Sequence, residues 1–387
     1  MELPMPNLFK AAANKASGLT RQTALYAGNA FDRVFRAASL VKAGQTPFET
    51  LHDDGLVSLR YYPPLAEDFI ELDDLVIPVE RKTHRTPIVI IPPLAVNMLI
   101  YDLFPQRSLV RFLRAKGFEV YLIDWGVPGR EHTHYNMHTY VAELLPAYLN
   151  RVRTHSGEQE LSLHGWSMGG MFTLFYSALS QDQHVRNAIV LGSPIDSHAS
   201  GLMGWMYQRI AEVAEVVRKR TGFRIHDVKP QWFHTPGWAN TIGFKLTNPI
   251  GSVMGYWELI VRLGDREFVT NHATTSAFLD RMVAYPGGII QDTVVRVWID
   301  NQLSKGEIQI GEDLARLENV SANLLAVAGQ EDTMVTPGAA KRVMDHVSST
   351  DKTFRVIPGG HMGILAGSKA PKESWLEMAE WLAERSN

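Results

Sequence analysis

Residues 161–172 read Leu161-Ser162-Leu163-His164-Gly165-Trp166-Ser167-Met168-Gly169-Gly170-Met171-Phe172. The pattern over residues 160–164 predicts a buried strand, and the small and apolar residues at 168–180 predict a helix. Between them lies the motif Gly-x-Ser-x-Gly, which is typical of a nucleophile elbow when a strand precedes it and a helix follows. The turn leaves no room for side chains two positions before and after the nucleophile, hence the glycines. A plain glycine-rich turn is the alternative, and the flanking strand and helix favour the elbow.

In such an elbow, backbone strain holds the serine hydroxyl above the sheet, and the N–H groups of the first helical turn face an oxyanion. We therefore predict that Ser167 is the nucleophile and that the backbone N–H of Met168 is one oxyanion donor. The second donor should come from the loop after the first central strand, where Ala95 is the first choice and Leu94 the alternative. Leu94 and Trp166 adjoin these groups and are predicted to contact the substrate.

The composition is that of an ordinary globular chain. Of its 387 residues, 45% are hydrophobic and 20% are charged, and the formal net charge is -3. This balance gives no basis for a nucleic-acid partner, and no run of 18 apolar residues predicts a membrane span. The absence of cysteine excludes disulfides, thiolate metal sites and a cysteine nucleophile. The N-terminus shows no secretory signal pattern. We predict no metal or cofactor and expect a cytoplasmic protein.

Residues 1–50 are predicted to form an amphipathic helical segment. Basic side chains lie between apolar residues that recur near helical spacing, and Gly18 and Gly28 argue against a single continuous helix. Such a segment suits a membrane surface, a hydrophobic granule or a partner subunit. The other interpretation is a helix that packs on its own domain. The apolar set comprises Leu8, Ala12, Leu19, Tyr26, Ala30, Val34, Ala38 and Val41.

Strand and helix patterns alternate over residues 51–195 and again over residues 302–387. This alternation implies a mostly parallel sheet with helices on both faces, so the predicted class is α/β, of the α/β-hydrolase type. The first two strands are expected to form an antiparallel entry into the sheet. The predicted strands cover residues 56–62, 75–80, 87–91, 120–125, 160–164, 188–191, 324–328 and 353–357.

The alternation stops over residues 196–301, where the pattern is helical and irregular and rich in large side chains. An insertion at this point is expected to form a helical cap that covers the serine with apolar walls and excludes water. The alternative is a helical subdomain whose aromatic residues fill its own core. Five of the nine tryptophans lie here, namely Trp205, Trp232, Trp238, Trp257 and Trp298.

A serine hydroxyl is a weak nucleophile unless a histidine takes its proton and a carboxylate orients that histidine. In this fold the chain order is serine, acid, histidine. Asp332 and His361 each follow a late strand, in loops that should meet the elbow at the carboxyl ends of the parallel strands. We therefore predict Ser167, Asp332 and His361 as the catalytic residues. Asp196 is the rival for the acid, and His164 is predicted to lie buried beneath the elbow.

Further motifs stand at strand ends and in loops. They are Ile91-Pro92-Pro93-Leu94-Ala95-Val96-Asn97, Tyr101-Asp102-Leu103, Ser108-Leu109-Val110-Arg111, Leu122-Ile123-Asp124-Trp125, Ser193-Pro194-Ile195-Asp196, Glu331-Asp332 and Pro358-Gly359-Gly360-His361-Met362-Gly363-Ile364. From about residue 55 to the C-terminus the chain resembles the polyhydroxyalkanoate synthases, and most closely their short class III type. The resemblance implies an α/β-hydrolase fold, the roles of Asp332 and His361, and a cap at 196–301.

The chain departs from that family at the nucleophile, since the family uses cysteine at the position of Ser167. A synthase moves an acyl chain from a coenzyme A thioester to an enzyme thioester, which is nearly isoenergetic. A serine ester lies lower in free energy, so onward transfer is slower, and water activated by His361 competes for the acyl-enzyme. We therefore expect an esterase or thioesterase that acts on apolar or hydroxyacyl substrates, with a coenzyme A thioester as a candidate substrate.

Two other functions stay open at this point. A divergent synthase would polymerise hydroxyacyl-coenzyme A, and the resemblance to class III implies a second subunit or a granule surface as its partner. A non-catalytic binding protein is the other, and the intact serine, acid and histidine disfavour it. The basic run Arg218-Lys219-Arg220 is either a contact for coenzyme A phosphates or a solvated helix end.

Overall fold

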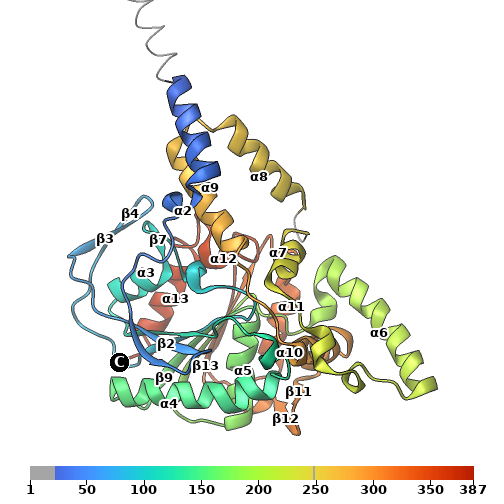
Figure 1. Cartoon of the computed structure of the whole chain (residues 1–387). Helices are drawn as coiled ribbons and strands as arrows, with labels where there is room; N and C mark the ends of the chain where they lie inside the picture. Colours follow the sequence, from blue (N-terminus) through green and yellow to red (C-terminus); the bar gives the residue numbers. More distant parts are fainter. Residues whose placement is uncertain (1–21, 247–248) are drawn as a thin grey trace, which may run out of the picture.

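The computed structural model describes residues 22–246 and 249–387. Its centre is an eight-stranded sheet in the order β1-β2-β8-β5-β9-β10-β13-β14 (Figure 1). Strands β1, β2 and β8 pair antiparallel, and every neighbouring pair from β8 to β14 is parallel. This sheet confirms the predicted α/β class. Its strands are β1 (Glu49–Asp53), β2 (Ser58–Tyr62), β5 (Ile88–Ile91), β8 (Val120–Asp124), β9 (Leu161–Trp166), β10 (Val185–Leu191), β13 (Asn323–Gly329) and β14 (Lys352–Ile357).

Helices cover both faces of the sheet, and the side-chain pattern of β5 shows why. Val89 and Ile91 belong to one hydrophobic core, and Ile88 and Ile90 belong to the other. All four side chains are buried, so this strand is a continuous apolar run, as expected for a parallel sheet covered on both faces. The first core contains α4 (Leu145–Ser156) and α5 (Met168–Ser180); the second contains α3 (Leu109–Ala115), α12 (Gly363–Ala366) and α13 (Ser374–Ala383).

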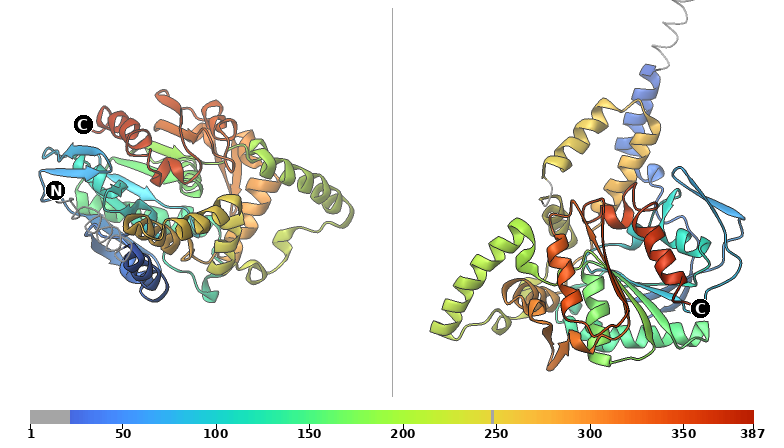
Figure 2. Two further views of the ribbon diagram at one scale, coloured as in Figure 1. Left: turned by 90° about the horizontal axis from the view of Figure 1, so that it is seen from above. Right: turned by 180° about the vertical axis from the view of Figure 1, so that it is seen from behind.

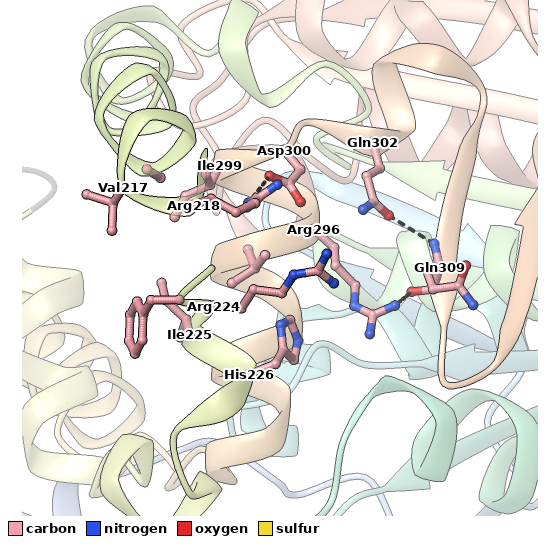
Figure 3. A pocket seen from close by; sticks show the side chains of 13 residues that line it. Val217, Arg218, Arg224, Ile225, His226, Arg296, Ile299, Asp300, Gln302 and Gln309 are labelled. Atoms are coloured by element: carbon pink, nitrogen blue, oxygen red, sulfur yellow. Dashed lines mark hydrogen bonds and ion pairs between the residues drawn. The ribbon is translucent and has the colours of Figure 1, made fainter. Parts of the chain in front are cut away.

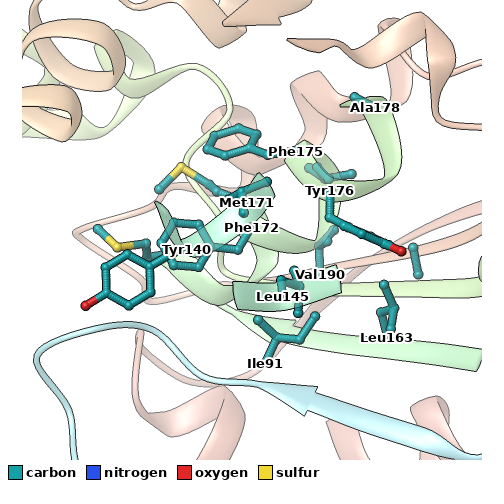
Figure 4. Close-up of a cluster of buried hydrophobic side chains, with 14 of the residues drawn as sticks. Ile91, Tyr140, Leu145, Leu163, Met171, Phe172, Phe175, Tyr176, Ala178 and Val190 are labelled. Carbon is teal, nitrogen blue, oxygen red and sulfur yellow. The ribbon is translucent and has the colours of Figure 1, made fainter. Parts of the chain in front are cut away.

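The helix after the elbow is held by the first of these cores (Figure 4). Met171, Phe172 and Phe175 of α5 are buried against the sheet, where Leu163 and Val190 contribute from β9 and β10. Full burial of each large apolar side chain stabilises the fold by about 1.5–3 kcal/mol. The packing therefore fixes the start of α5, and with it the residue that precedes this helix, relative to the strand ends.

The two antiparallel strands predicted ahead of the central strand take different places. The prediction at 56–62 corresponds to β2, which pairs with β8 in the main sheet. The prediction that 75–80 enters the main sheet is wrong, because β4 (Leu75–Pro78) pairs with β3 (Phe69–Leu72) in a separate two-stranded sheet. Only alternate residues of this hairpin are buried, which suits a strand pair that covers the α3 side of the protein with one face in solvent. The other antiparallel neighbour of β2 is β1, which the sequence pattern did not reveal.

Residues 22–35 form a helix that Gly28 does not interrupt. This helix packs on another part of the same chain, where Asp32 makes an ion pair of 2.6 Å with Arg266. The described part of the amphipathic segment thus agrees with packing on its own domain. The other half of the predicted pattern, residues 1–21, lies outside the described residues. Arg266 begins helix α9 (Arg266–Leu279), which also contacts the short helix α2 (Ala37–Leu40).

Between β10 and β13 the chain is mainly helical. Within the described part of residues 196–301, the only strand-like pairing is an isolated bridge between Thr235 and Tyr285. Figure 2 shows that α6 reaches outward on one side, whereas α8 and α9 project from the core beside the N-terminal helix. The helices of this region are α6 (Gly201–Thr221), α7 (Gly237–Leu246), α8 (Pro249–Val261), α9, α10 (Gly287–Asp292) and the π-helix η7 (Thr293–Ile299).

The chain also contains short elements that the sequence pattern did not predict. A hairpin follows the helical region, and a second short strand pair lies ahead of α3. Within residues 22–246 and 249–387, no helix combines the length and hydropathy that crossing a bilayer requires. These short elements are β6 (Asp102–Phe104), β7 (Arg107–Ser108), β11 (Glu307–Ile310) and β12 (Asp313–Arg316).

Candidate active site

Ser167 stands at the sharp turn between β9 and α5 with φ 55° and ψ -121°. A serine at positive φ is strained, and such strain persists only where the surroundings enforce it. The two glycines of the motif make the turn feasible. A Cβ on Gly165 would lie 2.3 Å from the backbone of Gly169, and a Cβ on Gly169 would lie 2.0 Å from the carbonyl oxygen of Ile91. The local sequence is therefore the reason that the serine can adopt this position.

Three side chains predicted from separate loops lie in one hydrogen-bonded series. The distance from His361 Nε2 to Ser167 Oγ is 3.0 Å, and the distance from His361 Nδ1 to Asp332 Oδ2 is 2.7 Å. The His361 side chain is 8% exposed and that of Asp332 is fully buried. A buried carboxylate on Nδ1 leaves Nε2 free to accept a proton from the hydroxyl, which is the arrangement that activates a serine.

Hydrogen bonds to the other carboxylate oxygen of Asp332 fix its orientation. Oδ1 accepts hydrogen bonds of 2.9 Å from the backbone N–H groups of Met334 and Val335. The rival acid, Asp196, is engaged elsewhere, because its Oδ1 accepts a 2.8 Å hydrogen bond from the side-chain amide of Asn301. The geometry therefore favours Asp332 over Asp196 as the partner of the histidine.

Two backbone N–H groups near the serine are available to an oxyanion. Among the described residues, the N–H groups of Met168 and Ala95 have no hydrogen-bond acceptor. Ala95 has φ 67°, and its carbonyl accepts a 2.8 Å hydrogen bond from the N–H of Val283 in the helical region. On the other side of this loop, the indole N–H of Trp125 donates to the carbonyl of Pro92 at 2.9 Å. Both bonds hold the loop in a conformation that Ala95 alone would not prefer.

The structure adds two supporting contacts that sequence reasoning missed. The indole N–H of Trp166 donates to the backbone carbonyl of His361 at 3.0 Å, so this tryptophan positions the histidine loop. The hydroxyl of Ser193, at the end of the adjacent strand, donates to the backbone carbonyl of Ser167 at 2.8 Å. For Ser193 the sequence did hold a signal, because this polar side chain comes just after a predicted buried strand. That strand, β10, pairs with β9, the strand that leads into the elbow.

A cavity of about 540 Å³ lies over the serine, with walls from both the sheet loops and the helical region. Its lining includes both predicted contact residues, Leu94 and Trp166, and is mainly apolar. Polar groups interrupt that lining, and the hydroxyls of Tyr285 and Thr293 are two of them. The Tyr285 hydroxyl donates to the sulfur of Met168 at 3.9 Å, and Thr293 Oγ1 is buried without a hydrogen-bond partner among the described residues. Such a cavity suits an apolar acyl group that carries an oxygen atom. Within the described chain, no group of three or more His, Asp or Glu side chains could hold a metal ion.

His164 lies beneath the elbow, where the sequence predicted it. It is fully buried in β9, and neither ring nitrogen has a hydrogen-bond partner among the described residues. Its nearest recorded aromatic neighbour is Tyr101, with ring centroids 6.4 Å apart. Burial of the ring disfavours the imidazolium and lowers the pKa of His164 from 6.5 to about 4. This histidine is therefore neutral in the folded protein and takes no part in the hydrogen-bonded series.

This burial predicts an acid-sensitive contribution to stability. Unfolded chains bind a proton at His164 below pH 6.5, whereas the folded protein does so only below about pH 4, so stability falls as the pH decreases between these values. The full difference corresponds to about 3 kcal/mol. Urea unfolding of wild type and His164→Phe at pH 7.5 and pH 4.5 measures it. The variant should lose less stability on acidification, and equal losses in both proteins would contradict the prediction.

Sequence comparisons agree with the architecture described above. The sequence profile described as "Serine aminopeptidase, S33" matches residues 105–365. Poly(3-hydroxyalkanoate) polymerase subunit PhaC of Haloferax mediterranei is 28% identical over 90% of this chain and 66% of its own length. The corresponding subunit of Haloarcula marismortui is 28% identical, with 89% and 69% covered. That of Synechocystis is 25% identical, with 89% and 86% covered. The chain thus spans about two thirds of the length of the two haloarchaeal relatives.

Comparison with solved structures supports the same fold. A soluble variant of monoglyceride lipase from Saccharomyces cerevisiae aligns with a TM-score of 0.51 at 16% identity, covering 90% of this chain and 97% of that one. At this identity the likeness concerns the fold alone. The parallel sheet, the elbow geometry and the matching profile lead to one assignment. The chain belongs to the family described as "Serine aminopeptidase, S33", as an enzyme with the α/β-hydrolase fold that resembles the polyhydroxyalkanoate polymerases.

Proposed function

We propose that this protein is a serine acyl hydrolase that cleaves ester or thioester bonds of apolar or hydroxyacyl substrates through an acyl-enzyme. The observation that carries the proposal is the continuous series of Ser167, His361 and Asp332, with hydrogen-bond distances of 3.0 and 2.7 Å. The series opens on a cavity whose mainly apolar lining suits an acyl chain. The described elements of 196–301 serve as the cap in this proposal, since they form much of that lining.

In the first half of the reaction, His361 Nε2 takes the hydroxyl proton as Ser167 Oγ attacks the acyl carbon. Asp332 stabilises the imidazolium that forms. The N–H groups of Met168 and Ala95 donate to the oxyanion of the tetrahedral intermediate. When the intermediate collapses, the carbon–oxygen or carbon–sulfur bond breaks, and His361 returns its proton to the leaving alcohol or thiol. The acyl group stays on Ser167 as an ester.

In the second half, a water molecule takes the place of the leaving group. His361 removes its proton, the hydroxide attacks the acyl-serine, and the acid is released as the serine regains its proton. The serine ester favours this outcome over onward transfer, because passing the acyl group to another hydroxyl only exchanges one oxygen ester for another, whereas hydrolysis of the ester is downhill in water. A cytoplasmic location, with a small acyl ester or acyl-coenzyme A as the ligand, is part of the same proposal.

The experiment that tests this proposal is a product analysis with 3-hydroxybutyryl-coenzyme A. We expect free thiol and free 3-hydroxybutyrate in equal amounts, with no polymer, because water resolves the acyl-serine faster than a second acyl group. Chromatography of the acid together with a thiol assay measures both products, and Ser167→Ala provides the blank. Polymer formation by the wild type would contradict hydrolysis and leave the acyl-enzyme chemistry in place.

A divergent polymerase is the second candidate, and the curated relatives favour it because their names describe poly(3-hydroxyalkanoate) polymerase subunits. For that function the acyl-serine would have to be attacked by the hydroxyl of another hydroxyacyl group instead of water. A second subunit or a granule surface would then be the expected partner. Thiol release that exceeds free acid, with the balance recovered as oligomer, would distinguish this candidate from hydrolysis.

A further inference from the structure

A second cavity, of about 370 Å³, lies against the π-helix η7 (Figure 3). Different side chains of this helix line two different cavities. Thr293, Val294 and Trp298 line the acyl cavity over the serine, whereas Arg296 and Ile299 line the second cavity. Helix α6 and the residues that follow it form the opposite wall. Because the helix contributes to both cavities, a ligand in the second one would lie next to the catalytic cap.

Basic groups dominate the second cavity. Arg218, Arg224 and Arg296 line it together with His226, and the only lining carboxylate is Asp300. Asp300 is already paired with Arg218 at 3.0 Å. Figure 3 shows the side chains of Arg224 and Arg296 extended toward the same part of the cavity. Of these two guanidinium groups, that of Arg296 is already paired with Asp292 at 3.0 Å, so Arg224 is the one that lacks a counter-charge among the described residues.

The neighbouring carboxylate, Asp292, does not compensate Arg224. Asp292 is buried and already accepts from the backbone N–H of Met137 at 3.0 Å, and it lies 3.1 Å from His226 Nε2 and 3.0 Å from Arg296 Nε. The guanidinium of Arg224 has no hydrogen-bond acceptor or ion-pair partner in the part of the chain that the structure describes. The cavity therefore offers the unpaired N–H groups of the Arg224 guanidinium, on a wall whose other charged side chains are already paired.

Apolar side chains form another part of the wall. Val217, Phe223 and Ile225 line the side from which Arg224 extends, and Phe223 is 48% exposed, so its ring is free to stack. Guanidinium groups match the geometry of phosphate oxygens, and an aromatic face accepts a flat ring. We propose that this cavity binds an organic phosphate with a flat apolar body, of the nucleotide diphosphate type. This site is distinct from the serine centre and does not depend on the reaction assigned to it.

The spacing along α6 allows two sources for such a phosphate. Tyr207 lines the acyl cavity and Arg218 lines the second one, a separation of about 16 Å along the helix at about 1.5 Å per residue. The nucleotide end of an acyl thioester would need a linker of about this length to place its acyl group over the serine. A free nucleotide would instead bind as a separate ligand. Both sources share the chemistry of the site.

Titration calorimetry of the full chain with ADP, and with inorganic phosphate as a second probe, tests the proposal. We expect ADP to bind to the wild type, and we expect Arg224→Ala to weaken this binding at least tenfold. Arg224→Lys should have an intermediate affinity, because lysine keeps the positive charge but cannot donate two parallel hydrogen bonds to a phosphate. The matched control is Arg220→Ala, which removes the same charge from the exposed end of helix α6, four residues before Arg224 and outside the cavity. It should bind ADP as the wild type does.

The outcomes of this experiment distinguish the proposed phosphate site from the proposed ester hydrolysis. No binding of ADP at millimolar concentration, or an equal loss in Arg224→Ala and Arg220→Ala, would overturn the proposed site. If the phosphate belongs to an acyl thioester, Arg224→Ala should raise KM for acyl-coenzyme A at least tenfold and leave KM for an uncharged p-nitrophenyl ester unchanged. If it belongs to a free nucleotide, ADP binding is lost with both KM values unchanged. A protein without esterase activity that still binds ADP would refute the proposed hydrolysis and support this site.

Discussion

Replacing Ser167 by alanine should lower kcat for p-nitrophenyl ester hydrolysis by a factor on the order of 10⁶, because the series of His361 and Asp332 then has no nucleophile to activate. The cavity and the oxyanion donors stay in place in this variant, so residual turnover above the uncatalysed rate is expected. Stopped or continuous assays at saturating substrate measure the change. Mass spectrometry after treatment with a fluorophosphonate should locate the label on Ser167 in the wild type and detect none in the variant.

A nearby serine provides the control for this experiment. Ser177 lies on the same helix, α5, and its hydroxyl donates to the carbonyl of Thr173 at 2.9 Å. Ser177→Ala should retain both turnover and labelling, since it removes a buried hydroxyl of the helix without touching the elbow. Labelling of another residue in Ser167→Ala, with activity retained, would refute the assignment of the nucleophile.

Replacing Asp332 by asparagine should lower kcat by about 10⁴-fold with little change in KM. The carboxylate holds His361 with Nε2 directed at the serine and stabilises the imidazolium, and an amide does neither when its N–H₂ group faces Nδ1. Steady-state kinetics on the same ester measures the effect. Because kcat changes and KM does not, the loss would be one of transition-state stabilisation.

The matched comparison is Asp196→Asn, the rival carboxylate at the end of the neighbouring strand. Its carboxylate accepts a hydrogen bond from Asn301 and, within the described part of the chain, makes no hydrogen bond or ion pair with the histidine. This variant should keep kcat within tenfold of the wild-type value. A larger loss in Asp196→Asn than in Asp332→Asn would exchange their roles and contradict the present assignment.

The order of strands and helices in the core follows from local pattern alone. Continuous apolar runs such as 87–91, and the small-residue turn around Ser167, are determined by residues close together in the chain. Edge elements were harder to predict, and the hairpin of β3 and β4 shows the reason. Its alternating burial is compatible with either sheet, and only packing against α3 decides which one it joins.

The residue types for nucleophilic catalysis could likewise be named without coordinates, because the elbow motif and the chain order of this fold specify them. The distances between these side chains could not be predicted. Ser167, Asp332 and His361 come from three loops, and the approach of these loops depends on the packing of the whole sheet. The same holds for the support that Trp166 provides to the histidine loop and for the convergence of Arg224 and Arg296 on one cavity. Local propensity acts over a few residues, whereas these contacts join segments far apart in the chain. Only the folded arrangement of both hydrophobic cores brings them together.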